Sequence, residues 1–449
     1  MKKSLISILM LLPLMVFAES VEIDGIWYNL DENAKEGEVT QSPNHNYSGS
    51  LEIPESVINE GVTYSVTSIS KQAFYLCTGL TSVFIPKSVT SIGNEPFQYC
   101  YGLSTILVEK SNPRFDSRNK CNAIIETSTN TVIAGCVNTI IPNSITTIGT
   151  SAFIGCRMKS FIIPNSVVSI GDYAFYGCSD LISMSIPNSV KTIGNNAFSW
   201  CSSLTSVFIP NSITFIGSQA FQGCSSLTSL TLPNNKIIIG RQAFYYCSSL
   251  TSVTIPNCET KTSSCVFGKC ESLTDVYCKA EIIAKDSSDD GLFIHAWTFD
   301  DNEGGNVLYQ VTLHVPETSI GTYRDEYPWK KFKNIVALNS DDIPETPKCS
   351  TPKINTVGDK IVFECETDDV EFVSELIVND AKRYYEKNIS TPQTFKITVY
   401  ATKPGYDNSE IATAEFYFSN VISKSGDING DGKVDVADHV KLSEIIMNQ

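Results

Sequence analysis

The stretch SVKTIGNNAFSWCSSLTSVFIP, residues 189–210, is followed at once by a near copy, SITFIGSQAFQGCSSLTSLTLP, residues 212–233. The pattern recurs through most of the chain, mainly in steps of 22 or 23 residues. Self-similarity at a fixed period of this length is the signature of a stacked repeat protein. A cysteine lies three residues after each phenylalanine of the most regular column, which holds Phe74, Phe97, Phe153, Phe175, Phe198, Phe221, Phe244 and Phe267.

Each repeat contains one short strand pattern, L-x-x-V-x-I, within the consensus I-P-x-S-V-x-x-I-G-x-x-A-F-x-x-C-x-x-L-x-x-V-x-I-P. Successive strand side chains alternate between faces, so Val207 and Ile209 share one face and Phe208 takes the other. One strand per repeat, always in the same direction, predicts a mainly β repeat solenoid with short irregular or helical segments. A single repeat cannot be stable alone, so stacking is obligatory. Its five or so large apolar groups contribute roughly 1.5–3 kcal/mol each. Ordering its 22 or 23 residues costs about 1.5 kcal/mol for every residue, which is more than these groups supply.

Both ends of the repeat array carry sequences suited to caps. The segment 49–70 reads as an incomplete first turn of the solenoid, and strand-rich sequence around GIWYNL, residues 25–30, precedes it. The segment 311–338 predicts a short helix and a final strand. Residues 109–138 break the period, and CNAIIETSTNTVIAGC within them predicts a β-hairpin inserted as an irregular turn.

These columns resemble the BspA-like leucine-rich repeats, also described as Treponema pallidum-type, found in surface proteins of host-associated bacteria. The resemblance covers roughly Val21 to Leu338 and includes the CNAIIETSTNTVIAGC insert and the FKNIVAL end. It implies a curved solenoid over residues 19–338 that acts in adhesion by binding a host extracellular protein or glycan. The resemblance supplies no catalytic residues, so we expect a non-catalytic protein.

The start of the chain has the order of a secretory signal. The chain begins with two lysines, continues with an apolar run over residues 5–16 and reaches the small-residue end VFA just before Glu19. We therefore expect a signal peptide at 1–18. The mature protein is then secreted or held at the cell surface. A net charge of −16 argues against nucleic acid as a partner. No other apolar run reaches the roughly 18–20 residues that a membrane span needs, so we expect no membrane insertion.

Fifteen cysteines in an exported chain would ordinarily indicate disulfides. Equivalent residues of stacked repeats lie about 4.8 Å apart with parallel Cβ vectors, whereas a disulfide needs Cβ atoms about 3.5–4.5 Å apart. We therefore predict a ladder of buried thiols that act as small hydrophobic groups. Adjacent-repeat disulfides and metal binding are the alternatives. Outside the ladder, Cys258, Cys265 and Cys278 could pair locally, and so could Cys349 with Cys365.

The strand face opposite the leucines is the candidate ligand-binding surface, with Phe84, Ile162, Phe208 and Tyr277 as its candidate residues. Exposed aromatic side chains on a rigid, nearly uncharged, hydroxyl-rich surface suit a glycan or an extended protein. The alternative is that the row only satisfies β-propensity. The rest of the row and the serines beside it are Leu107, Ser185, Thr231, Thr254, Ser82, Ser160, Ser183, Ser206, Ser229 and Ser252.

A proline-punctuated linker at 339–352 separates the solenoid from β-rich sequence at 353–420. The runs KIVFECE, VEFVSELIV and TFKITVYATKPGYDNSEIATAEFYF predict a small β-sandwich. This region resembles the immunoglobulin-like modules of secreted bacterial proteins, which implies a spacer that holds the solenoid away from its attachment point.

The C-terminal segment 423–449 contains the run GDINGDGKVDVADHV, which has the offsets of a calcium loop, with Gly432 at the sharp turn. Hard oxygen ligands at these offsets converge on one ion. The predicted ligands are Asp427, Asn429, Asp431, the Lys433 carbonyl, Asp435 and Asp438. An aspartate at the twelfth position resembles a dockerin repeat, which implies a cohesin-like partner, but a type I dockerin has two repeats and this chain shows one. A solvated acidic tail is the alternative.

An enzyme, or membership of a calcium-dependent polysaccharide-degrading assembly, is the alternative function. Glycoside hydrolysis needs two carboxylates about 5–9.5 Å apart, and between Pro142 and Pro256 the chain offers only Asp172 and Asp180. Carboxylates gather with histidine and tryptophan only in the segment 286–303, which a cap loop explains equally well. A third possibility is a structural module with no ligand for the solenoid.

Overall fold

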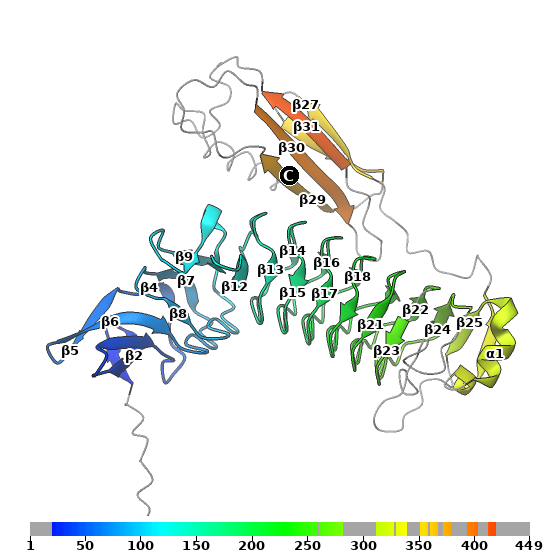
Figure 1. Cartoon of the computed structure of the whole chain (residues 1–449), viewed down its shortest axis with the longest axis horizontal. Helices are drawn as coiled ribbons and strands as arrows, with labels where there is room; N and C mark the ends of the chain where they lie inside the picture. The colour runs from blue at the N-terminus through cyan, green and yellow to red at the C-terminus, as the bar shows by residue number, and fades with distance from the viewer. Residues whose placement is uncertain are drawn as a thin grey trace, which may run out of the picture.

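The computed structural model describes residues 20–257, 260–281, 311–326, 329–338, 351–357, 360–366, 371–378, 393–402 and 412–418. Up to residue 338 these residues form one elongated β solenoid. It runs from the N-terminal strands, through a series of stacked turns, to the helix α1 (Ile320–Asp325) at the opposite end (Figure 1). We call each turn of this solenoid a rung.

Each central rung contributes two short parallel strands, so the prediction of one strand per repeat was wrong. The V-x-I segments form β14 (Ser160–Ile162), β16 (Ser183–Ser185), β18 (Ser206–Phe208), β20 (Ser229–Thr231), β22 (Ser252–Ile255) and β24 (Asp275–Cys278). The second sheet pairs β13 (Thr147–Ile148), β15 (Ser169–Ile170), β17 (Thr192–Ile193), β19 (Phe215–Ile216), β21 (Ile237–Ile239) and β23 (Thr260–Thr262). Most strands of the second sheet have only two residues, which is too short for the alternating pattern that identifies a strand in a sequence. They pair because the stacking of the rungs brings them side by side.

The N-terminal cap is a β-sheet, as the sequence predicts. It contains β1 (Val21–Ile23), β2 (Ile26–Asp31), β3 (Glu36–Val39), β6 (Val62–Ile69) and β5 (Ser56–Asn59), with β8 (Ser91–Ile92) paired to β6. The first rungs then supply the parallel strands β4 (Gly49–Glu52), β7 (Leu80–Ile85) and β9 (Thr105–Val108).

The predicted hairpin and the C-terminal cap are both present. The irregular segment 109–138 contains three antiparallel strands, β10 (Phe115–Asp116), β11 (Ala123–Glu126) and β12 (Thr131–Gly135). Strand β12 then pairs in parallel with β13, so the hairpin continues the second sheet. At the other end, β25 (Thr312–Val315), α1 and β26 (Asn334–Ala337) close the array, with Tyr323 and Trp329 fully buried.

A single file of phenylalanine rings forms the core of the solenoid. The centroids of the Phe153, Phe175 and Phe198 rings are 5.2 Å apart at each step, and their planes are within 5° of parallel. The file continues to Phe267 with centroid steps of 5.1–5.6 Å. All the rings in this file are buried. The predicted stacking of identical side chains is therefore confirmed.

The A-F-x-x-C turns stack as closely as the strands do. The backbone N–H groups of Tyr173, Phe175 and Gly177 donate to carbonyls of the next rung at 2.7–2.8 Å. Two positions of each turn adopt left-handed backbone, which points these N–H groups along the solenoid axis. Residues between the strands are thus held by inter-rung hydrogen bonds, and their side chains have defined positions.

The cysteines of the repeat column are free thiols, and each makes a hydrogen bond beyond its apolar role. The Sγ atoms of Cys178, Cys201 and Cys224 each donate to a phenylalanine carbonyl of the preceding rung at 3.2–3.3 Å. Burial raises the pKa of the Cys178 and Cys224 thiols well above the ordinary value, so both stay protonated at neutral pH. The predicted pairs that need Cys258 or Cys349 involve residues outside the described ranges.

The region after residue 350 is β-rich, as predicted. Its antiparallel pairs are β27 (Lys353–Val357) with β28 (Lys360–Glu364), and β30 (Gln393–Thr402) with both β29 (Glu371–Val378) and β31 (Ala412–Phe418). The immunoglobulin-like sandwich remains a prediction. The predicted signal peptide, linker residues 339–350 and the 423–449 tail lie outside the described residues. No helix within the described ranges is long and apolar enough to cross a bilayer.

Candidate binding surface

The predicted row of outward side chains follows the register of the V-x-I strands. Phe84 lies opposite Leu107 in the first rungs, and Ile162, Ser185 and Phe208 are successive partners in the central rungs. The serines predicted beside them, such as Ser160, Ser183 and Ser206, pair in the same way. The strand face, defined as the outward side of these V-x-I strands, therefore carries a row in which apolar side chains predominate, called the apolar row, next to a row of serines.

Three members of the apolar row are well exposed. Phe208 is 41% exposed, Leu107 39% and Ile162 37%, whereas Phe84 is half-buried. Val207 and Ile209 turn inward on either side of Phe208, as the strand alternation predicts. Phe208 is thus the most exposed aromatic side chain of the predicted row.

Tyr277 does not belong to the exposed surface, so its assignment as a binding residue was wrong. It is only 7% exposed, because His314 of β25 stacks on its ring at a centroid distance of 4.5 Å. The His314 Nε2 atom is in turn 2.8 Å from the Asp275 carboxylate. Strand β25 follows only after the interruption at 279–311, so the repeat pattern did not reveal this neighbour. Thr254, next to Tyr277 in the row, is also buried.

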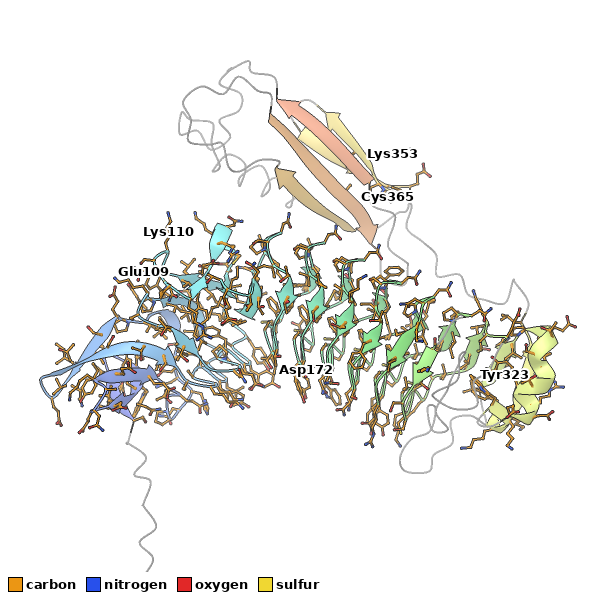
Figure 2. The ribbon with its side chains drawn as sticks, viewed as in Figure 1. Glu109, Lys110, Asp172, Tyr323, Lys353 and Cys365 are labelled. Carbon is orange, nitrogen blue, oxygen red and sulfur yellow. The ribbon has the colours of Figure 1, made fainter. Side chains whose placement is uncertain are left out.

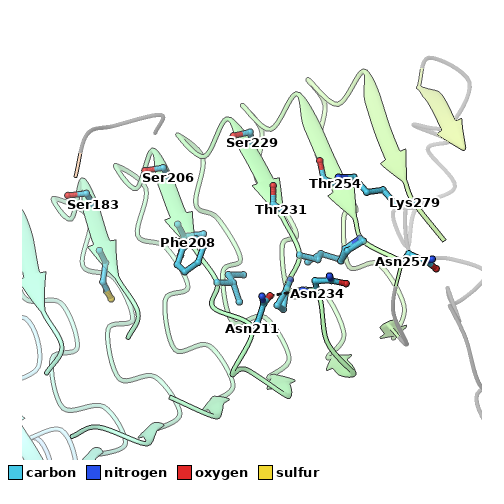
Figure 3. Close-up of a pocket in the computed structure, with 16 residues that line it drawn as sticks. Ser183, Ser206, Phe208, Asn211, Ser229, Thr231, Asn234, Thr254, Asn257 and Lys279 are labelled. Atoms are coloured by element: carbon cyan, nitrogen blue, oxygen red, sulfur yellow. Dashed lines mark hydrogen bonds between the residues drawn. The ribbon is translucent and has the colours of Figure 1, made fainter. Parts of the chain in front are cut away.

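A groove of about 420 Å³ lies across the strand face around Phe208 (Figure 3). Its hydroxyl side is Ser206, Ser229 and Thr231, and its far edge is a ladder of asparagines that follow the I-P and L-P ends of the strands. The backbone N–H of Asn234 donates to the Asn211 side-chain oxygen of the preceding rung at 2.7 Å. Lys279 is the one charged side chain among the described lining residues.

The asparagine edge was missed by the sequence analysis, although its signal is visible there. Asn211, Asn234 and Asn257 each follow a proline at the same place in the repeat. Only the stacking shows that they line the same groove as Phe208. A chain of amide and hydroxyl groups beside one exposed ring can hydrogen-bond to an extended ligand while the ring packs against its apolar part.

The two central carboxylates have structural partners. The Asp172 carboxylate accepts a hydrogen bond from the Asn195 backbone N–H at 2.6 Å, across one rung. Asp172 lies along the lower edge of the solenoid in Figure 2. The Asp180 carboxylate accepts a hydrogen bond from the Ser179 hydroxyl at 3.2 Å. The acidic segment 286–303 and the predicted calcium ligands Asp427, Asn429, Asp431, Lys433, Asp435 and Asp438 lie outside the described residues.

Several solved structures are similar to parts of this chain at low sequence identity. A leucine-rich repeat protein from Bacteroides ovatus is 21% identical over 74% of this chain and 84% of that chain, with a TM-score of 0.41. The pneumococcal vaccine antigen PcpA is 15% identical over 72% and 99%, with a TM-score of 0.38. The T. pallidum leucine-rich repeat protein is 23% identical over 57% and 91%, with a TM-score of 0.26. A comparison with curated proteins finds no match.

A protein-family model gives a more specific result. The model described as a BspA type leucine rich repeat region matches residues 45–133, 134–225 and 191–288, in six copies. These ranges together span more than half of the 449 residues and contain the stacked rungs from Phe74 to Phe267. The chain therefore belongs to the BspA-type leucine-rich repeat family.

Proposed function

We propose that this chain is a secreted or cell-surface binding protein whose strand face recognises a host extracellular protein or glycan. The observation that carries the proposal is the groove around Phe208, where an exposed aromatic ring lies among hydroxyl and amide groups on a rigid scaffold. Aromatic side chains that become fully desolvated in a complex contribute much of the binding free energy of many interfaces. The near absence of charge in this groove favours a neutral ligand or segment.

The scaffold itself supports a binding function. Side chains of the strand face are repeated at each rung, and their backbone is fixed by parallel pairing on both sides. A rigid surface loses little conformational entropy when it binds, so its contacts translate more fully into affinity. The described part of the strand face presents no pair of carboxylates in a shared groove that would favour the hydrolase alternative.

Replacing Phe208 by serine is expected to weaken binding through the strand face by about 2 kcal/mol, roughly a 30-fold rise in Kd. Arrays of extracellular-matrix proteins and glycans identify the ligand, and calorimetry with the purified chain then gives the Kd values. Phe215→Ser is the matched control, because Phe215 is similarly exposed at 38% but lies on the second sheet. Equal affinity of Phe208→Ser and the unmodified chain would remove the groove from the binding site.

We also propose that the 423–449 tail binds one calcium ion through the ligands predicted above. Removing one carboxylate ligand with Asp431→Ala is expected to lower the calcium affinity at least about tenfold, because each ligand contributes directly to coordination. Calcium titration calorimetry of the full chain measures this change. Glu444→Ala removes the same charge from the same tail outside the ligand positions, so it should leave the affinity unchanged. Equal losses from both substitutions would indicate a general acidic tail.

The alternative, attachment to a polysaccharide-degrading assembly, depends on this tail and not on the solenoid. It requires a cohesin-like partner that is captured in calcium and released by a chelator. Deleting residues 426–449 separates the two functions, because the solenoid would keep its ligand while the tail's partner would be lost.

A further inference from the structure

A second groove, of about 470 Å³, lies on the A-F-x-x-C turns that lead the chain from the second sheet back to the first. We call it the turn-face groove. Five successive rungs line it, and its lining is a mixture of aromatic and amide side chains. Its aromatic and amide side chains include Tyr99, Tyr173, Tyr176, Trp200, Asn196 and Gln222. Nothing in the proposed function uses this groove.

Two of these aromatic residues occupy a backbone position that favours glycine. The residue before each repeat cysteine has a left-handed conformation, with φ of 60° at Tyr99 and 63° at Trp200. Glycine occupies the same column at Gly155, Gly177 and Gly223, with φ of 69–73°. A bulky residue there costs about 1–2 kcal/mol. The same column also holds Leu76, Tyr246 and Lys269, so the fold accepts several residue types there and does not itself require an aromatic ring at Tyr99 or Trp200.

Each strained aromatic ring lies over a glycine of the next rung. A Cβ atom on Gly155 would be 2.3 Å from Tyr99 Cδ1, and one on Gly223 would be 2.7 Å from Trp200 Cε3. The large and small residues are therefore complementary, and any side chain at these glycines would displace the ring above. Trp200 remains 46% exposed, so one face of its indole packs on backbone while much of the ring stays open to solvent.

The polar groups of the groove are available to a ligand. Asn196 is 9% exposed and lines the groove, and its side-chain amide makes no hydrogen bond within the described residues. Glu95 is the one charged side chain among the described lining residues, and its carboxylate accepts hydrogen bonds from Gln72 at 2.8 Å and Ser151 at 3.3 Å. Glu95 is thus the single charge of the described lining, and the Asn196 amide is free to donate a hydrogen bond to a ligand and to accept one from it.

We propose that the turn-face groove binds a neutral, extended oligosaccharide. One face of a pyranose ring carries only C–H groups and stacks on an aromatic ring, here Trp200 and Tyr99. Sugar hydroxyls both donate and accept hydrogen bonds, as do amide side chains and tyrosine hydroxyls. A proline-rich peptide also packs on aromatic side chains but offers mainly carbonyl acceptors. It would leave the amide oxygens of Asn196 and Gln222 unmatched, so the composition of the groove favours a glycan.

The test measures binding of the full chain to a panel of neutral hexasaccharides, made of β-linked glucan, xylan and mannan and of α-linked glucan. We expect one of these to bind and to change the tryptophan fluorescence, with Trp200→Ala raising the Kd at least about tenfold. Tyr246→Ala is the matched control: Tyr246 has the same column position, a φ of 60° and 43% exposure, but it does not line the groove. It should leave the Kd unchanged.

A second variant separates loss of binding from loss of folding. Gln222 has ordinary backbone and lines the groove, so Gln222→Ala should weaken binding several-fold while the thermal unfolding midpoint stays unchanged. The proposal is overturned if no hexasaccharide binds, if Trp200→Ala and Gln222→Ala keep full affinity, or if Tyr246→Ala loses as much as Trp200→Ala. Binding of a proline-rich peptide that Trp200→Ala abolishes, without any glycan binding, would also overturn it. Phe208→Ser should not affect this site, so the strand-face proposal can fail independently.

Discussion

Replacing Gly217 by alanine is expected to destabilise the centre of the solenoid by about 3 kcal/mol or more. A Cβ atom at this position would lie 2.5 Å from the Asn195 backbone nitrogen and 2.5 Å from the Gly194 carbonyl carbon. Both atoms belong to the backbone of the preceding rung, so no side-chain rotation relieves the overlap. The rungs would have to move apart, which breaks the pairing of β17 with β19 and opens the phenylalanine file.

Urea unfolding followed by circular dichroism measures the effect of Gly217→Ala. The control is Gly321→Ala in α1, where the new Cβ has no atom within 4 Å. Alanine has the higher helix propensity, so this control should stabilise the chain by up to about 1 kcal/mol. If the two variants unfold at the same urea concentration, close approach of the rungs is not the reason for the glycine.

The glycines of the I-G column share this close approach to the preceding rung. Cβ atoms on Gly93, Gly171, Gly194 and Gly240 would meet backbone atoms of the preceding rung at 2.3–2.8 Å. The glycine of I-G is thus required by the distance between rungs and not by a left-handed turn. Its recurrence in the sequence is a direct consequence of the stacking.

Raising the pH above about 9 is expected to unfold the chain steeply, because many buried thiols must stay protonated in the folded state. Desolvation raises the pKa of Cys100, Cys178, Cys224 and Cys247 above the ordinary 9.0. Below pH 9 the thiols are protonated in both states and this contribution to stability is complete. As the pH rises further, only the unfolded chain releases these protons, so the free energy of unfolding falls by about 1.4 kcal/mol per thiol and pH unit.

Urea titrations at pH 7, 9 and 10 in the presence of a reductant give this slope. Replacing Cys178, Cys224 and Cys247 together by alanine should remove three titrating groups and flatten the slope above pH 9 by roughly 4 kcal/mol per pH unit. The same thiols should react with a thiol reagent only upon unfolding, since the thiolate is the reactive form. An unchanged slope in the triple variant would show that other groups cause the alkaline transition.

The sequence alone determined the features that repeat with the period of the chain. Phe175 and Cys178 recur in register, so their stacking into a core file and a thiol ladder follows from the period, as does the outward orientation of Phe208. The hairpin near Ala123 and the cap at α1 carry local turn and strand signals of their own. Such features depend on a residue's own repeat and on equivalent residues one period away, which a sequence displays directly.

Tertiary structure alone decided what depends on contacts between non-equivalent residues. The second sheet consists mostly of two-residue strands that exist only through pairing with neighbouring rungs. Tyr277 is buried because His314 reaches it across an interruption of the period. The turn-face groove arises because Trp200 and Tyr99 lie over glycines of the next rung, while Asn196 lines the same space. The repeat period of the sequence predicts which equivalent residues stack. The contacts and grooves between non-equivalent side chains depend on how the side chains pack in three dimensions.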